Sequence, residues 1–420
     1  MTDQGRTSSV GTRVLLILLF AYIFNFIDRQ IIGILAVPIQ AEFQLDDRTL
    51  GRLGVVFGLF YAVIALPIAV RADRGKRVGI VAGAIGLWSL FTAACGLAQN
   101  FTQLVLARMG VAFGEAGGIA PSYALIADFF PKTRRARALA FFSLGIPIGS
   151  ALGIFFGGWL AQHLNWRAAF LIVGLAGLPI ALLVRFAVPE PVRGGMDEGG
   201  AAAAPAPRLA DAARSFVRKP SFWLLSFGAA SGSILGYGLA FWLPSLLTRS
   251  FGLAPADVGW FYGSIALIGG VAGTWLGGWL GDRLGPARPG IYALIPAICF
   301  LITAPAFALG LFAPNLWVAW ILFTIGQMTS LAWLGPVLSA VQHIVAPGIR
   351  ATTSAAFLFV NNLIGIAFGI YVLGWMSDGL KALYGAESLK YSILYGLGFY
   401  LLAAGFYFAA SRRLARDWAD

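Results

Sequence analysis

Charged residues are scarce in this sequence. Only 11% of its 420 residues are Asp, Glu, Lys or Arg, whereas 59% are hydrophobic. A soluble protein of this length needs far more polar surface to cover its core, so the composition excludes the soluble globular class. The sequence therefore predicts a polytopic membrane protein.

Signatures of enzymes and metal sites are also missing. The chain has two Cys and two His, and it has no cluster of His, Cys and carboxylates with metal-ligand spacing. It contains neither a G-x-S-x-G nucleophile turn nor a G-x-x-x-x-G-K-[ST] phosphate loop. These absences argue against an enzyme, against a metal or other cofactor, and against transport driven by ATP. Cys95 and Cys299 both fall in apolar segments, so no disulfide framework is expected.

Apolar segments occupy most of the chain instead. About 20 apolar residues in a helix cross the ~30 Å hydrocarbon core, so each segment is expected to be a membrane helix. The expected fold is all-α, with twelve transmembrane helices in two pseudo-symmetric six-helix bundles. The twelve segments are 14–37, 50–70, 78–98, 101–127, 136–162, 167–188, 221–248, 257–281, 289–312, 315–345, 351–378 and 390–411.

The basic residues predict an orientation. If both termini are cytoplasmic, 22 of the 30 Lys and Arg lie on the cytoplasmic side, as the positive-inside rule requires. The net charge of +12 then reflects topology, and the expected partners are membrane lipids and not nucleic acids. We expect a monomeric, integral protein of a bacterial inner membrane.

The longest polar interruption, residues 189–220, is rich in Gly, Ala and Pro. That composition predicts a flexible cytoplasmic linker, with residues 208–218 as a candidate amphipathic helix on the inner leaflet. The expected organisation is an N-terminal bundle at 1–188, the linker at 189–220 and a C-terminal bundle at 221–420.

An internal repeat supports two halves. Asp73-Arg74 and Asp282-Arg283 follow the second and eighth segments and lie 209 residues apart. The runs PKTRRARALAFF and PGIRATTSAAFL, from Pro131 and Pro347, align at a spacing of 216. Parallel repeats of this kind are typical of transporters.

Four charges interrupt the apolar segments. Asp28 and Arg29 lie near the middle of the first segment together with Asn25, and Arg108 and Glu115 lie two helical turns apart on one face of the fourth. An ion at a helix centre costs about 2.5 to 3.5 kcal/mol, so such residues are functional candidates. A purely structural ion-pair network is the alternative, although replacing a buried pair with apolar residues is often neutral or stabilising.

A carboxylate in this setting can exchange a proton when the site opens to water, because hydration and the neighbouring arginines change together. Glu115 is the expected proton-coupling residue and Asp28 its partner. Arg29 or Arg108 would then meet an anionic headgroup, and the residues alone do not distinguish the two arginines.

The C-terminal half has no charge at mid-membrane. It offers aromatic and amide side chains, which suit an amphiphile, although packed aromatics and interhelical hydrogen bonds explain each of them equally well. The candidate substrate-binding residues there are Tyr237, Trp242, Gln327, Trp333 and Asn361, with Asn362 beside the last.

The layout and the loop motifs resemble the major facilitator superfamily, whose loop pattern is Gly-x-x-x-Asp-Arg-x-Gly-Arg. The second copy fits at Gly278, Asp282, Arg283 and Gly285. The first copy matches at Asp73, Arg74 and Arg77 but has Ala69 and Lys76 in place of the two glycines. The resemblance implies that the matching acidic and basic residues, Asp73, Arg74, Arg77, Asp282 and Arg283, are gating residues that hold one access state.

Within that superfamily, FNFIDR, GEAGGIAPSYALIADFFP and SLGIPIGSALG together resemble the Spinster family of lipid-type transporters. Organic-anion symporters of the superfamily share the Asn-x-x-Asp-Arg run, so the first helix by itself does not separate them.

Two glycine ladders repeat at four-residue intervals. Each ladder forms one flat helix face that permits close backbone approach. One interpretation is static packing within a half. The family resemblance implies that segments five and eight meet between the halves, so we expect a sliding contact with Gly149 and Gly273 as gating residues. The ladders are Gly145, Gly149, Gly153 and Gly157, and Gly269, Gly273, Gly277, Gly281 and Gly285.

The expected function is secondary transport by alternating access, facilitative or coupled to protons, of a lipid-like amphiphile with an anionic or zwitterionic head. The alternative is a proton-coupled symporter of small organic anions such as sugar acids. A lipid scramblase or a membrane receptor is a further alternative, and proteoliposomes separate them: a transporter gives gradient-dependent flux, a scramblase gradient-independent lipid movement, and a receptor neither.

Overall fold

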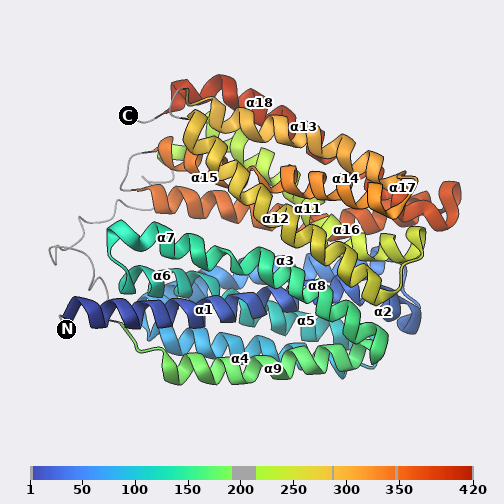
Figure 1. Cartoon of the computed structure of the whole chain (residues 1–420), viewed down its shortest axis with the longest axis horizontal. Coiled ribbons are helices and arrows are strands. Elements are labelled where there is room, and N and C mark those ends of the chain that lie inside the picture. The colour runs from blue at the N-terminus through green and yellow to red at the C-terminus, as the bar shows by residue number, and fades with distance from the viewer. Residues whose placement is uncertain (1–2, 192–213, 286–287, 346–348, 419–420) are drawn as a thin grey trace. The chain divides into compact units, whose positions relative to one another are not determined.

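The computed structural model describes residues 3–191, 214–285, 288–345 and 349–418. The side chains of residues 3–9, 66, 69, 70, 73, 74, 132, 133, 136 and 351 are excepted. Over the described ranges the chain is helical and contains no strand, so the predicted all-α class is confirmed (Figure 1).

Within residues 3–191 of the described chain there are nine helices. They are α1 (Asp3–Ile34), α2 (Ala36–Phe43), α3 (Asp47–Arg74), α4 (Arg77–Gly96), α5 (Phe101–Ala116), α6 (Ile119–Phe129), α7 (Lys132–Ser143), α8 (Gly145–His163) and α9 (Trp166–Ala187).

Residues 214–217 form a helical turn within the candidate amphipathic helix, and the remaining described helices of the second half begin at Pro220. They are α11 (Pro220–Phe251), α12 (Pro255–Leu284), α13 (Ile291–Leu311), α14 (Leu316–Leu331), α15 (Leu334–His343), α16 (Arg350–Tyr384), the short 3₁₀-helix η3 (Gly385–Glu387), α17 (Ser388–Gly396) and α18 (Gly398–Asp417). Residues 192–213 of the predicted linker, and with them most of its candidate amphipathic helix, lie outside the described residues.

Ten continuous apolar runs of the described chain are long enough to cross a membrane. The expected fourth segment is not among them, because it is broken between Ala116 and Ile119 into α5 and α6. The last run, Thr352–Asp417, contains both the eleventh and the twelfth expected segments. The expected twelve membrane segments are thereby accounted for.

The chain divides into two compact units, and the division is not strictly six helices plus six. Unit 1 comprises Met1–Gln44, Val56–Ala204 and Ala254–Gly263, and unit 2 comprises Leu45–Val55, Pro205–Leu253 and Ser264–Asp420. The start of α3 therefore packs in unit 2, and the start of α12 packs in unit 1. Both exchanged stretches follow the first loop of their half.

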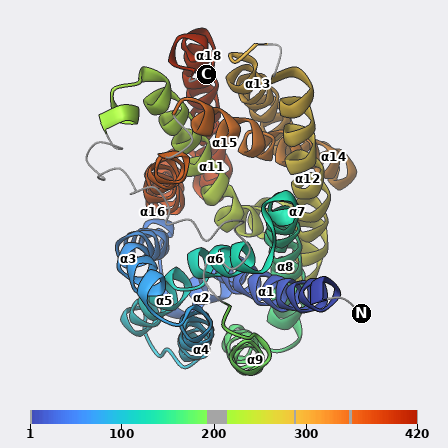
Figure 2. The same ribbon diagram turned by 90° about the vertical axis from the view of Figure 1, so that its left-hand side faces the viewer.

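In unit 1, α4 lies along α9, and α1 lies along α8 (Figure 2). Glycines permit these contacts. A Cβ on Gly174 of α9 would lie 2.3 Å from the backbone nitrogen of Ala93, so only a residue without a side chain fits there. The start of α12 joins this unit through α8: the backbone N–H of Ala256 donates to Gln162 Oε1 at 2.9 Å, and Trp260 packs edge-on against Phe155.

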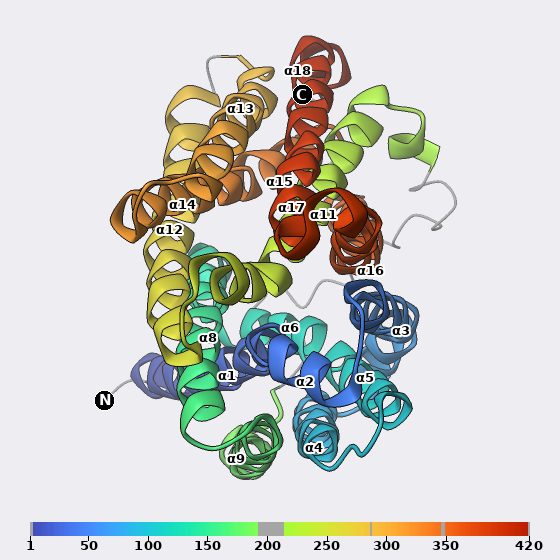
Figure 3. The same ribbon diagram turned by 90° about the vertical axis from the view of Figure 1, so that its right-hand side faces the viewer.

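In unit 2, α11 packs on α16 and α18, and α13 packs on α14 and α18 (Figure 3). The internal repeat is visible in matching helices of the two units. Both α5 and α14 have 16 residues, and each is capped by an Asn side chain, Asn100 accepting from Gln103 N and Asn315 from Val318 N. Both are followed, after a two-residue break, by a second helix.

The glycines of the two ladders lie close to helices of their own units. A Cβ on Gly149 would lie 2.4 Å from the carbonyl oxygen of Ile23 in α1, and a Cβ on Gly273 would lie 2.1 Å from that of Met328 in α14. Among the described residues, the ladder faces of α8 and α12 thus meet α1 and α14 within their own units. Beside its ladder, α8 also meets the start of α12, where a Cβ on Gly158 would lie 2.3 Å from the carbonyl oxygen of Pro255. The contacts of Gly149 and Gly273 agree with the alternative of static packing, and the predicted gating role of these two glycines stays a prediction.

Candidate substrate and proton site

The four intramembrane charges lie together in unit 1, on α1 and α5. Arg29 Nε donates to Glu115 Oε2 at 2.6 Å, and Arg108 Nη1 lies 3.6 Å from Asp28 Oδ1. Each helix contributes one cation and one anion, so the two ion pairs cross between the helices. Thr92 of α4 donates its hydroxyl proton to the other oxygen of Asp28, Oδ2, at 2.5 Å.

Burial differs within this quartet. Glu115 is 0% exposed and Asp28 2%, whereas the Arg29 side chain is 13% exposed, the largest value of the four. Arg108 is 4% exposed. Arg29 is consequently the arginine that a ligand can reach most directly, a distinction that the sequence does not make.

The helix break in the fourth membrane segment directly follows Glu115. The backbone N–H groups of Gly117 and Gly118 donate to the carbonyls of Gly114 and Glu115, at 3.0 and 3.1 Å, which makes tight turns between α5 and α6. A Cβ on Gly114 would lie 2.5 Å from the backbone nitrogen of Trp88, so α5 reaches α4 through backbone contact. The glycines on either side of Glu115 therefore fix the depth and direction of that carboxylate.

Several polar atoms around the quartet have no hydrogen-bond partner among the described residues. They include both amide atoms of Asn25, Glu115 Oε1, Asp28 Oδ1 and the hydroxyl of Ser89. Buried polar groups are bonded in the great majority of cases, and each exception requires an explanation. Unused hydrogen-bonding capacity at this depth suits a site that takes up a proton, water or a polar ligand.

Aromatic rings surround the two guanidinium groups. The ring centre of Phe57 lies 5.8 Å from the Arg29 guanidinium carbon and 5.0 Å from that of Arg108, so one ring contacts both cations. Tyr61, one turn further along α3, lies 5.0 Å from Arg29, and Phe26 lies 5.3 Å from it. Cation–π contact holds a guanidinium without neutralising it, which leaves its charge available to an anion.

Among the predicted residues of the C-terminal half, Trp242 is fully buried, and its indole N–H donates to the carbonyl of Ile370 at 2.8 Å. It therefore connects α11 to α16, and its predicted binding role stays a prediction. Trp333 is also buried, beside the ring of Phe357 at 6.4 Å.

Asn361, Tyr237 and Gln327 lie in unit 2 with different surroundings. Asn361 is buried, accepts from Ser233 Oγ at 2.8 Å and donates to Asn362 Oδ1 at 3.3 Å. Tyr237 and Gln327 are half-buried. Their predicted part in substrate binding stays a prediction.

The loop residues predicted to gate have various environments. Arg77 donates to Asp128 of α6, while the Glu190 carboxylate accepts from the backbone N–H groups of Arg77 and Val78 at 2.6 and 3.0 Å. In the second copy Asp282 and Arg283 are exposed, and Arg283 lies over the ring of Trp279 at 5.2 Å. The side chains of Asp73 and Arg74 lie outside the described residues.

Sequence reasoning missed several residues of these sites. Phe57 and Tyr61 are spaced by one helical turn in an aromatic-rich segment, and that spacing is a signal for a shared face. Thr92 and Glu190 show no distinguishing pattern in the sequence. Within the described part of the chain, no group of three or more His, Cys, Asp or Glu could hold a metal ion.

Comparison with known proteins decides the family. Residues 18–370 match the family model described as Major Facilitator Superfamily. An "MFS-type efflux pump" of Mycolicibacterium smegmatis is 35% identical over 395 residues, covering 94% of this chain and 91% of the relative. A solved bacterial homolog of the human lysosomal transporter Spinster, inward-facing and unoccupied, has 33% identity and a TM-score of 0.89, with 98% of this chain and 99% of that chain covered.

The chain is a Major Facilitator Superfamily transporter of the Spinster type. Mouse protein spinster homolog 1 is 29% identical over 397 residues, covering 90% of this chain and 75% of the relative. The membership confirms the resemblance drawn from the three Spinster-like motifs and establishes an integral membrane protein. Two halves with repeated helices, as in the two units here, are typical of transporters of this superfamily.

Proposed function

We propose that this Spinster-type transporter moves an amphiphile whose headgroup carries an anionic group, by alternating access coupled to a proton on Glu115. The observation that carries the proposal is the Arg29–Glu115 pair. Glu115 has no exposed surface, and its contact with Arg29 at 2.6 Å joins it to the most exposed cation of the quartet.

Charge balance links the proton to the substrate. The quartet is neutral with both carboxylates ionised, and protonation of Glu115 leaves one positive charge on Arg29. A buried charge without its partner is strongly unfavourable, so the protonated site favours an anionic group on Arg29. Release of that group favours re-formation of the pair and release of the proton. Proton and anionic group therefore enter and leave together.

The surroundings of Arg29 favour an amphiphile. Phe26, Phe57 and Tyr61 present aromatic faces around the guanidinium, which provide apolar area beside the charge. Transporter sites near the membrane midplane commonly combine such apolar walls with a few polar groups. Asn25, which lies one helical turn before Arg29 with unused amide atoms, is proposed to contact the polar head.

The proposed orientation has both termini in the cytoplasm. It rests on the distribution of Lys and Arg in the loops, of which 22 of 30 then lie on the cytoplasmic side. A bacterial inner-membrane location agrees with the bacterial relatives, whose names describe an efflux pump and a homolog of a lysosomal transporter.

Transport in proteoliposomes tests the proposal. The probe is a fluorescent lysophosphatidylglycerol, whose head is anionic, with a monoacylglycerol as the neutral-headed comparison and glucuronate as the small-anion comparison. We expect a pH jump to drive net movement of the lysolipid by the wild type. Glu115→Gln keeps the shape of the side chain without a titratable proton, so it should bind the lysolipid but lose the response to the pH jump.

Glu42→Gln is the matched control. Glu42 also pairs with an arginine, Arg167, at 2.5 Å, but its side chain is 44% exposed at the end of α2. It should retain the pH response. A wild-type pH response in Glu115→Gln would refute the role of Glu115. Movement of glucuronate but not lysolipid would favour the small-anion symporter, and gradient-independent movement of both lipids would favour a scramblase.

A further inference from the structure

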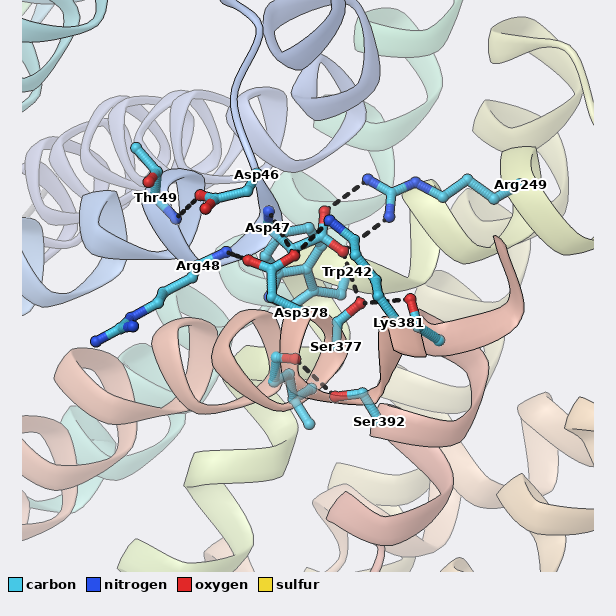
Figure 4. Close-up of polar contacts among 12 residues, drawn as sticks. Asp46, Asp47, Arg48, Thr49, Trp242, Arg249, Ser377, Asp378, Lys381 and Ser392 are labelled. Carbon is cyan, nitrogen blue, oxygen red and sulfur yellow. Dashed lines mark hydrogen bonds and ion pairs between the residues drawn. The ribbon is translucent and has the colours of Figure 1, made fainter. Parts of the chain in front are cut away.

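The start of α3 is held in unit 2 by a buried carboxylate that the transport site does not use. Asp47 is 2% exposed and accepts from both terminal nitrogens of Arg249, Nη1 to Oδ2 at 2.9 Å and Nη2 to Oδ1 at 2.8 Å (Figure 4). Ser377 of α16 donates its hydroxyl proton to Oδ2 at 2.6 Å. Such a two-pronged guanidinium contact is geometrically specific as well as strong.

A second carboxylate connects the same elements in the opposite direction. Asp378 of α16 accepts from the backbone N–H groups of Asp47 and Arg48, at 3.4 and 2.7 Å, and so caps the first turn of α3. Helix N-termini have unsatisfied N–H groups that favour a negative charge. Asp378 is itself paired with Lys381 at 2.5 Å. We call Asp47, Arg249, Ser377 and Asp378 the α3 latch.

Backbone contact beneath the latch is close. A Cβ on Gly374 of α16 would lie 2.4 Å from the carbonyl oxygen of Asp47, and a Cβ on Gly54 of α3 would lie 2.6 Å from the Cβ of Ile370. Gly51 similarly faces Tyr371. The first two turns of α3 therefore lie in close backbone contact with α16.

The same helix continues to the transport site. From Val56 onward α3 belongs to unit 1, and Phe57 contacts both Arg29 and Arg108. Asp47 and Phe57 are ten residues apart, which is about 15 Å along a helix at 1.5 Å per residue. The latch and the ring that contacts both arginines therefore lie on one continuous helix.

We propose that the α3 latch holds the start of α3 on α11 and α16 in one access state and opens in the other. Its contacts suit this use, because water can replace charged hydrogen bonds when the helices separate. Separation of an apolar contact would instead expose apolar surface to water. The loop before Asp47 is on the external side in the proposed orientation, so the latch lies on that side. The inference rests on alternating access, but neither on the proton coupling nor on the substrate.

Distances between spin labels test the latch without substrate and at one pH, so failure of the transport proposal does not affect the result. The labels replace Arg52, exposed on α3, and Leu383, which is 76% exposed near the end of α16. The background carries Ala in place of the two buried cysteines, Cys95 and Cys299. Double electron–electron resonance then reports the separation of α3 from α16.

Asp47→Asn removes the charge that Arg249 and Ser377 share. One charged hydrogen bond corresponds to roughly a 10- to 100-fold change in an equilibrium, so the ratio of long to short distances should rise by about that factor. Ser377→Ala, which keeps the ion pair, should shift the ratio in the same direction by less. If Asp47→Asn does not fold, Ser377→Ala decides by itself.

Asp257→Asn is the matched control, because Asp257 occupies the first turn of α12 as Asp47 does that of α3 but is exposed. It should leave the distances unchanged. Wild-type distance distributions in both Asp47→Asn and Ser377→Ala would overturn the latch, as would an equal shift in Asp257→Asn.

Discussion

Gly149→Ala tests whether the glycine ladder of α8 positions the charged face of α1. The added Cβ would lie 2.4 Å from the carbonyl oxygen of Ile23 and 2.7 Å from the Cβ of Phe26, whereas ordinary contact begins at 3.4 Å. α1 must therefore move by about 1 Å relative to α8. Over-packing of a close contact typically costs about 1 to 3 kcal/mol.

The displacement acts directly on the transport site, because Asp28 and Arg29 follow Phe26 on the same helix. The Arg29–Glu115 hydrogen bond is 2.6 Å long, and a shift of about 1 Å takes it beyond the usual range for an N–H to oxygen bond. We therefore expect Gly149→Ala to lower both the melting temperature and the affinity for the lysolipid probe. Loss of turnover with unchanged binding, which a sliding contact would produce, is not expected.

Gly83→Ala is the control, because a Cβ on Gly83 of α4 meets nothing within 4 Å. Alanine in an open helical position is neutral or stabilising by up to about 1 kcal/mol. The two variants should then differ by roughly 1 to 4 kcal/mol in unfolding free energy, measured in the same detergent. Equal melting temperatures would refute the reasoning, since they would show that α1 and α8 are not in backbone contact at Gly149.

Two further predictions concern single hydrogen bonds. Thr92→Val removes the hydroxyl that donates to Asp28 at 2.5 Å, so it should lower unfolding stability by about 1.5 to 3 kcal/mol, whereas Thr102→Val at an exposed site should change it little. The pKa of Glu42 is lowered from 4.5, first by the hydrogen bond from Arg167 and then by that from Trp166. A carboxyl group whose pKa is lower in the folded state than in the unfolded state stabilises the fold at pH values above its unfolded-state pKa. That stability is lost as the pH falls through the folded-state pKa. The melting-temperature difference between wild type and Glu42→Gln should thus be constant at neutral pH and vanish at acidic pH; a difference that grows on acidification would contradict this sign.

Much of the site could be predicted from local sequence. Asp28, Arg29, Arg108 and Glu115 stand out because charge in a lipid-spanning helix is unfavourable wherever the helix packs, and helical periodicity places Arg108 and Glu115 on one face. The pairing could not be predicted. Two cations and two anions on two helices can form ion pairs within or between the helices, and both arrangements are electrically neutral. Only the rotation and depth of α1 against α5 make Arg29 the partner of Glu115.

The sequence by itself determined the membrane class, the twelve segments, the repeat and the charged centre, because each follows from local hydropathy, spacing or charge in a lipid environment. Only the tertiary structure decided which surfaces meet. Glycine ladders favour close contact without naming a partner, and α1 and α14 proved to be the partners of α8 and α12. Asp47 likewise stands between Asp46 and Arg48 in what reads as a solvated loop, yet it is buried against Arg249, 202 residues away. Contacts between residues so distant in sequence depend on the packing of whole helices, which no local pattern encodes.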